Sequence, residues 1–163
     1  MKITIRETKT RKKIPAQILK ANKKDMPLKK DGWQFNWREL YRDKEAMFYK
    51  VVLSNDTKVL GIVMVSMLYN EILFMNDIET EPQSVGSEGR YQNIAGSLIA
   101  YACRLSFEKG KGNYIGFLVF DSKTKLFNLY KNRYGATPTM GQRMCIEPAQ
   151  GKKLITEYLK EKS

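Results

Sequence analysis

Residues 89–102, GRYQNIAGSLIAYA, change character halfway along. The first part is polar and contains glycine, whereas the second part is an apolar run rich in alanine. A loop of this kind that opens directly into a helix leaves backbone N–H groups unpaired at the positive end of the helix dipole, where a phosphate can bind. Glycines at such a junction also serve purely structural turns. The stretch lacks the Gly-Lys-Ser/Thr of a P-loop and the GxGxxG of a dinucleotide-binding fold.

The sequence before this junction predicts antiparallel strands. Period-two alternation and β-branched residues predict one strand over residues 2–7. Three more strands, joined by the turn residues 55–57 and 69–70, should form a meander over 46–54, 58–68 and 71–79. Between the first strand and the meander, Ile14, Ile18 and Leu19 fall on one face of a helix predicted over 14–22, with Pro15 in its first turn.

The sequence after the junction alternates between helices and strands. The helix opened by the junction should end at Gly110, because Ile94, Leu98, Ala102 and Leu105 recur at helical spacing. The apolar run 114–120 predicts a strand buried on both faces. Ser122 is expected to cap a second helix that ends at Gly135, and a strand over 143–147 and a helix over 152–162 follow.

This order of elements predicts the fold class. A strand, crossover helix and strand unit added to an antiparallel meander makes an α/β fold with a mixed, mostly antiparallel central sheet flanked by helices. The chain has 163 residues, which is enough for a single domain over 1–163 with its own core. No repeat, low-complexity tract or linker interrupts it.

The composition excludes several kinds of chemistry. The chain contains no histidine, which removes Ser/His and Cys/His nucleophile pairs and nearly every zinc site built on imidazole, so no metal is expected. Cys103 and Cys145 have no paired spacing and read as buried free thiols in a reducing compartment. No signal peptide is expected, because the N-terminal residues contain no apolar stretch of the kind one needs, and the longest apolar run, 61–68, is too short to span a bilayer. A cytoplasmic protein with no membrane partner is expected.

The charge is concentrated near the N-terminus. Residues 1–30 hold eleven Lys or Arg and two acidic residues, a net +9 of the chain's +12. A basic segment of this kind suggests a polyanionic partner such as nucleic acid, or a solvated face. No aromatic residue lies among these charges before Trp33, as a base-stacking surface would need.

The residues from 90 to 110 resemble the core motif of the GNAT N-acetyltransferase superfamily. In that family an Arg/Gln-x-x-Gly-x-Gly/Ala loop opens a helix with a pair of leucine-like residues. Arg90 and Ala95 match the first and last places of the loop, and Leu98 and Ile99 match the pair. Asn93 departs from the pattern, because it stands where the family prefers glycine.

A second motif supports the resemblance. In the family, a helix ends in Tyr-x-x-x-x-Gly-Phe/Ala, and YKNRYGA has Tyr130, Gly135 and Ala136 at these places. Lys123 stands where an asparagine is common. The Ser-Lys-Thr before the tyrosine helix resembles a bacterial branch of the family. By motif the match covers residues 90–136, and by element order it covers 46–147.

The resemblance implies acetyl-CoA as the acetyl donor. Backbone N–H groups from Gln92 to Ser97, with help from Arg90, would hold its pyrophosphate, and Asp77 to Glu79 would pair with its pantetheine arm. The cofactor-binding residues expected on this basis are Asp77, Ile78, Arg90, Tyr91, Gln92, Asn93, Ile94, Ala95, Gly96, Ser97 and Lys123. Lys123 is either a cation near the cofactor or a solvated residue at a helix start.

Acetyl transfer to an amine needs a base, because an amine with a pKa of ~10.4 is mostly protonated at neutral pH. Without histidine, carboxylates are the main candidates, and Asp77, Glu79 and Glu81 alternate onto one face of a strand. Glu79 is nearest the position where many family members carry their base, although a water chain or a solvated strand end remains open. By its motif, Tyr130 would donate a proton to the CoA sulfur; its alternative is a half-buried aromatic residue.

Two classes of function follow from the sequence. The first is an acetyl-CoA-dependent N-acetyltransferase that acts on an unidentified primary amine by direct transfer. An amine on a ribosomal protein or an aminoacyl-tRNA is one acceptor that the basic segment would suit. The alternative is a non-catalytic GNAT-like module that binds nucleic acid through this segment. Because GNAT proteins often dimerise, the resemblance is also compatible with a homodimer, although no exposed apolar stripe in the sequence marks an interface.

Overall fold

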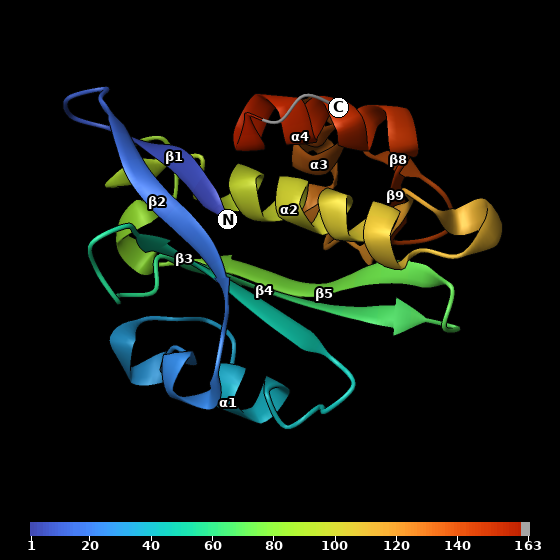
Figure 1. Ribbon diagram of the computed structural model, residues 1–163, viewed down its shortest axis with the longest axis horizontal. Helices are drawn as coiled ribbons and strands as arrows, with labels where there is room; N and C mark the ends of the chain where they lie inside the picture. Colours follow the sequence, from blue (N-terminus) through green and yellow to red (C-terminus); the bar gives the residue numbers. More distant parts are fainter. Residues whose placement is uncertain (161–163) are drawn as a thin grey trace. The chain divides into compact units, whose positions relative to one another are not determined.

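The computed structural model (Figure 1) describes residues 1–160. These residues divide into two compact units. Unit 1 comprises residues 1–64 and 77–98, and unit 2 comprises residues 65–76 and the described residues from 99 onward. Two strands and one helix, β4 (Gly61–Leu68), β5 (Ile72–Thr80) and α2 (Ile94–Lys109), contribute residues to both units. The prediction of a single domain over 1–163 stays a prediction.

The sheet is mixed and mostly antiparallel, and helices flank it, so the predicted fold class is confirmed. Within residues 1–160 its hydrogen-bonded order is β6-β1-β2-β3-β4-β5-β7-β9-β8. The remaining strands are β1 (Lys2–Glu7), β2 (Lys13–Lys20), β3 (Met47–Leu53), β6 (Tyr91–Gln92), β7 (Leu118–Asp121), β8 (Thr137–Pro138) and β9 (Arg143–Ile146). The remaining α-helices are α1 (Trp37–Leu40), α3 (Phe127–Tyr134) and α4 (Pro148–Leu159).

The helix predicted over 14–22 is wrong, because this segment forms β2. Residues four apart lie on one face of a helix, but they also lie on one face of a strand, so the spacing of Ile14 and Ile18 fits both. Ala16, which lies between them, is buried like Ile18, and Ile14 is half-buried, so the inward-facing residues recur with a period of two. Strands on both sides complete the pairing, with Ala16 opposite Ile3 of β1 and Leu53 of β3.

In unit 1, an apolar cluster holds the segment between β2 and β3 in place. This segment forms two 3-10 turns, Lys23–Asp25 and Lys29–Asp31, before α1. Trp37 of α1 is fully buried, and its ring makes an edge contact with Phe48 of β3 at 6.4 Å between ring centres. The buried members of the cluster are Ala21, Met26, Trp33, Trp37, Phe48, Ile62 and Met64.

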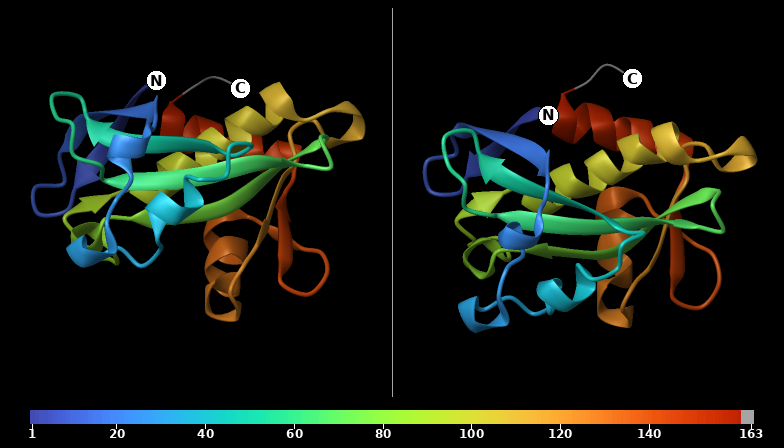
Figure 2. Two further views of the ribbon diagram at one scale, coloured as in Figure 1. Left: turned by 90° about the horizontal axis from the view of Figure 1, so that it is seen from below. Right: turned by 60° about the horizontal axis from the view of Figure 1, so that its bottom comes forward.

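In unit 2, the crossover predicted from the sequence is confirmed. The chain leaves β5, forms α2 and returns as β7, which lies parallel to β5 with Leu73 opposite Leu118. Helix α4 runs beside the unit 2 part of α2 (Figure 2), and Lys152 lies over the ring of Phe107 at 5.8 Å. Gly151 of α4 is buried at this contact.

Several boundaries in unit 2 differ from the prediction, among them the start of the terminal helix, which is Pro148 and not residue 152 because Pro148 fits the first turn of a helix. The strand predicted over 114–120 begins only at Leu118, because Gly116 takes a positive φ of 87° and Tyr114 and Ile115 are exposed. Ser122 does not cap a helix; its hydroxyl donates to the Lys123 carbonyl at 3.0 Å. The end of α3 at Gly135, with φ 68°, is as predicted. The last predicted residues of the terminal helix, 161 and 162, lie outside the described residues.

Candidate functional site

The first turn of α2 presents unpaired backbone N–H groups in unit 1. In the described part of the chain, the N–H groups of Ile94, Ala95 and Gly96 donate no hydrogen bond. The next N–H group, that of Ser97, donates to the Asn93 carbonyl at 3.1 Å. A 16-residue helix that begins with three free donors offers an anion both hydrogen bonds and the favourable end of a dipole.

Asn93 turns the chain into this helix. Its φ is 75°, in the left-handed region that glycine adopts freely and that asparagine tolerates better than most residues. Its carbonyl also accepts a hydrogen bond from the Ser97 hydroxyl at 2.6 Å. The position at which the GNAT pattern prefers glycine is therefore one that requires a positive φ, and asparagine satisfies the same requirement.

Hydrogen bonds within the loop before Asn93 fix its shape. The Gln92 side-chain amide donates to Thr8 Oγ1 at 3.0 Å and to the Ser87 carbonyl at 3.2 Å, and the Thr8 hydroxyl donates to the Gly89 carbonyl. The Tyr91 N–H donates to Ser84 Oγ at 3.2 Å. Among the residues predicted to bind the cofactor, Gln92 and Tyr91 thus support the loop through these groups.

Arg90 supplies a positive charge at the start of the loop. Its side chain is exposed, and the guanidinium lies 4.9 Å from the centre of the Tyr91 ring. No carboxylate of the described residues forms an ion pair with it. A guanidinium that is accessible in this way can pair with two phosphate oxygens at once.

Two glycines make room for the loop and the helix. A Cβ on Gly61 of β4 would lie 2.4 Å from Ile94 Cγ2, so the missing side chain allows the first turn of α2 to pack on the strand. A Cβ on Gly89 would lie 2.4 Å from the Ser84 backbone. Gly61 and Thr8 carry no site signal in the sequence, since their contacts with Ile94 and Gly89 join segments far apart in the chain. Ser84 belongs to no motif that points to a site.

Glu79, near the end of β5 in unit 1, is the carboxylate with the most hydrogen-bond donors around it among the described residues. Glu79 Oε2 accepts a hydrogen bond from the Gln34 N–H at 2.6 Å, and Oε1 accepts from the Phe35 N–H at 3.1 Å and from Trp37 Nε1 at 2.8 Å. Three donors therefore hold this carboxylate against the segment that leads into α1 and against Trp37, the first residue of α1. Asp77 and Ile78 are half-buried, and β5 leaves its ladder with β7 after Met75.

Tyr130 lies on α3 in unit 2. Its ring packs against Phe120 at 4.8 Å and Tyr134 at 6.1 Å, and burial raises the pKa of its hydroxyl above the ordinary value. The hydroxyl therefore keeps its proton at neutral pH. Lys123 is exposed before the 3-10 turn that leads into α3, and its carbonyl accepts from the Leu126 N–H at 2.9 Å.

Other chemistry is limited in residues 1–160. Cys103 and Cys145 are free and buried, and burial raises the pKa of the Cys103 thiol to about 12 and that of Cys145 to about 11. These thiols are neutral at physiological pH and are poor nucleophiles. The described residues contain no cluster of three or more acidic or cysteine side chains placed to hold a metal ion. No helix among them is long and apolar enough to cross a membrane.

No family model and no curated protein sequence matches the chain. Solved structures with the same fold do match. AtaT complexed with acetyl-methionyl-tRNAfMet has a TM-score of 0.63 and 15% identity, with 86% of this chain and 99% of that chain covered. The KacTA–DNA complex gives 0.62 and 14%, with coverage of 87% and 99%. An acetyltransferase from Trypanosoma brucei gives 0.53 and 13%, with coverage of 78% and 96%.

These similarities show the fold of this chain. The fold is that of GNAT acetyltransferases, as the motifs around Arg90 and Tyr130 predicted. One similar structure, that of AtaTR, contains bound acetyl-CoA.

Proposed function

We propose that this protein is an N-acetyltransferase that uses acetyl-CoA as its acetyl donor. The observation that carries the proposal is the first turn of α2, where three unpaired backbone N–H groups follow an asparagine with a positive φ. The exposed Arg90 adds the charge that a pyrophosphate needs. The fold, which is shared with known acetyltransferases, supports the same conclusion.

The proposed cofactor-binding residues would contact different parts of acetyl-CoA. Ile94, Ala95 and Gly96 would donate N–H groups to the pyrophosphate, and Arg90 would pair with its charge. Asp77 and Ile78, at the polar end of β5, are proposed to lie along the pantetheine arm, and Lys123 is proposed as a further cation for the cofactor. When bound, acetyl-CoA supplies a thioester that an amine can attack directly.

Two side chains are proposed to move protons. Tyr130 would donate its proton to the leaving sulfur, a role for which its protonated state is suited. Glu79 is the proposed base that accepts the proton of the amine, directly or through a water molecule. Its three hydrogen bonds favour a positioning role as well, since they hold residues 34–37 beside the end of β5.

We propose an acceptor amine that is attached to a nucleic acid, such as an aminoacyl-tRNA. The loop between β1 and β2 and the start of β2 expose four cations, Lys9, Arg11, Lys12 and Lys13. Figure 1 shows this loop projecting from the two strands (blue). The structure of AtaT with acetyl-methionyl-tRNAfMet gives a precedent for such an acceptor in this fold.

Transfer of labelled acetyl groups to a panel of amines tests the proposal. The panel contains aminoacyl-tRNA, a ribosomal protein fraction and small primary amines. We expect Tyr130→Phe to lower kcat by about 10²-fold or more, and Tyr114→Phe, an exposed tyrosine in the same unit, to leave it unchanged. Equal kcat values for the two variants would remove Tyr130 from the mechanism.

The alternative, a non-catalytic module that binds nucleic acid, rests on the same exposed cations. It predicts tight, salt-sensitive RNA or DNA binding without any binding of acetyl-CoA. In either case Lys12→Gln should reduce the slope of log K against log salt by about one, and Lys111→Gln, an exposed lysine in unit 2, is the control. Binding of acetyl-CoA separates the two functions.

A further inference from the structure

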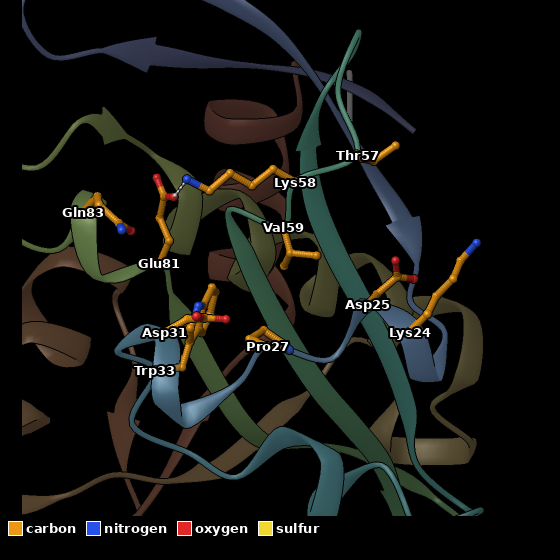
Figure 3. A pocket seen from close by; sticks show the side chains of 10 residues that line it. All are labelled: Lys24, Asp25, Pro27, Asp31, Trp33, Thr57, Lys58, Val59, Glu81 and Gln83. Atoms are coloured by element: carbon orange, nitrogen blue, oxygen red, sulfur yellow. Dashed lines mark ion pairs between the residues drawn. The ribbon is translucent and has the colours of Figure 1, made fainter.

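A pocket of about 490 Å³ lies wholly within unit 1. Its walls come from three segments, which are the 3-10 turns after β2, the connection from β3 to β4, and the residues after β5 (Figure 3). The lining includes Asp31, Trp33, Lys58 and Glu81. The acetyl-transfer proposal uses none of these four side chains.

Glu81 is a buried carboxylate with one oxygen that accepts no hydrogen bond. Only 1% of the residue is exposed. Its Oε2 accepts from the Ser84 hydroxyl at 2.6 Å, whereas Oε1 has no donor. Lys58 Nζ lies 3.4 Å from Oε1 as an ion pair, and the Lys58 side chain is half exposed. A buried acceptor without a hydrogen-bond donor is unfavourable. A ligand that supplies an N–H group to Oε1 would therefore form the hydrogen bond that this oxygen lacks.

Asp31 brings a second carboxylate to the pocket. It is exposed, and its side chain forms no hydrogen bond or ion pair within the described part of the chain. The third acid in the wall, Asp25, is already neutralised by Lys50 at 2.7 Å. The two carboxylates that lack hydrogen-bond donors are therefore Asp31 and, through Oε1, Glu81.

The rest of the wall contains the polar residues Lys24, Thr57 and Gln83 and an apolar part that suits an aliphatic stem and a flat cation. Pro27 and Val59 provide apolar surface, and Trp33 provides the edge or face of an indole ring. Cations bind favourably near aromatic rings, and a guanidinium also matches a carboxylate with two parallel N–H groups.

We propose that this pocket binds an organic cation with N–H donors, a guanidinium or primary ammonium group on a short aliphatic stem. The cationic head lies between Glu81 Oε1 and Asp31, and the stem lies on Pro27, Val59 and Trp33. Lys58 swings toward solvent when the ligand enters, because its side chain is half exposed and the ligand replaces it as the partner of Glu81. This binding does not depend on acetyl-CoA.

Calorimetric titration with butylguanidinium tests the proposal on the full chain without acetyl-CoA. Butylurea, which is similar in shape but uncharged, is the control ligand. We expect saturable binding of butylguanidinium that weakens tenfold or more in Asp31→Asn and in Glu81→Gln. Glu45→Gln, an exposed acid of unit 1 outside the pocket, should bind like the unmodified protein. Asp31→Asn keeps the test valid if Glu81→Gln fails to fold, because Asp31 is on the surface.

For Lys58→Gln, the direction of the change in butylguanidinium affinity distinguishes a cation site from an anion site. If the pocket binds cations, Lys58→Gln should bind butylguanidinium more tightly, because the competing ammonium group is gone. If the pocket instead bound anions through Lys58, the same change would weaken anion binding. Tighter binding of N-acetylarginine amide than of butylguanidinium would identify an arginine side chain as the source of the cation, and weaker binding a free small molecule. No saturable binding at millimolar concentration, or equal binding of butylurea, would overturn the proposal.

Discussion

At the scale of single residues, Asn93 shows that a departure from a motif can preserve the geometry that the motif encodes. The loop needs a positive φ, and asparagine provides it at a lower cost than any residue with a bulky side chain.

The first prediction concerns this residue. Asn93→Gly should keep or slightly raise the free energy of unfolding. Asn93→Ala should lower it by about 1–2 kcal/mol, because the alanine Cβ is strained in the left-handed conformation. Urea unfolding of the variants at equal pH measures the difference. If Asn93→Ala were as stable as the unmodified protein, the positive φ would not be a constraint on this loop.

The second prediction concerns Glu79. Glu79→Gln removes an anionic acceptor from two backbone N–H groups and one indole N–H, so the free energy of unfolding should fall by about 1–3 kcal/mol. Glu45→Gln, on the surface of the same unit, is the matched control and should change it by less than ~0.5 kcal/mol. An unaltered stability for Glu79→Gln would speak against the positioning role and leave catalysis as the role of Glu79.

Some residues of the candidate site can be predicted from the sequence and others cannot, and the reason is physical. Arg90, Asn93 and Tyr130 belong to local motifs, and a motif can be read along the chain. The hydrogen bonds from Gln34, Phe35 and Trp37 to Glu79 join residues more than 40 positions apart, so no local pattern reveals them.

At the scale of elements, the contact between β4 and the first turn of α2 decides where the free N–H groups lie. Gly61→Ala should place a methyl group against Ile94 and lower the free energy of unfolding by about 1–3 kcal/mol through overpacking. The same change should weaken acetyl-CoA binding, because it moves the start of α2. Ser54→Ala, in the exposed turn after β3, is the control for both measurements. Unchanged values for both quantities would contradict the close contact.

The elements also show where pattern reading fails. The predicted end of helix α2, Gly110, lies one residue after its observed end at Lys109. The prediction is this close because the long apolar repeat and the glycine that follows it indicate the same end. Strand β2 was predicted as a helix, because its pattern of apolar residues four apart fits both periods and only pairing with β1 and β3 decides between them. The two-residue strands β6 and β8 have no pattern long enough to read.

At the scale of the whole molecule, buried thiol and phenol groups make the free energy of unfolding depend on pH in the alkaline range. Burial raises the pKa of Cys103 to about 12 from 9.0 and that of Tyr134 to about 12 from 10.0. Both groups hold their protons more tightly in the folded state, so their contribution is complete below the ordinary pKa values and is lost as the pH rises toward the folded ones. The free energy of unfolding should therefore fall from about pH 9 upward.

Urea unfolding across this pH range measures the effect. Cys103→Ala should make the alkaline decline shallower, even though the variant loses some packing at neutral pH. A decline with the same slope in both proteins would mean that Cys103 does not cause it.

The most direct test of the central claim is a calorimetric titration with acetyl-CoA, compared with S-acetylpantetheine, which lacks the pyrophosphate. We expect micromolar binding of acetyl-CoA and at least tenfold weaker binding of S-acetylpantetheine. Most of this difference should be lost in Arg90→Gln but not in Arg38→Gln, an exposed arginine of the same unit. Absence of acetyl-CoA binding, or equal affinity for the two thioesters, would contradict the claim that the first turn of α2 holds the pyrophosphate.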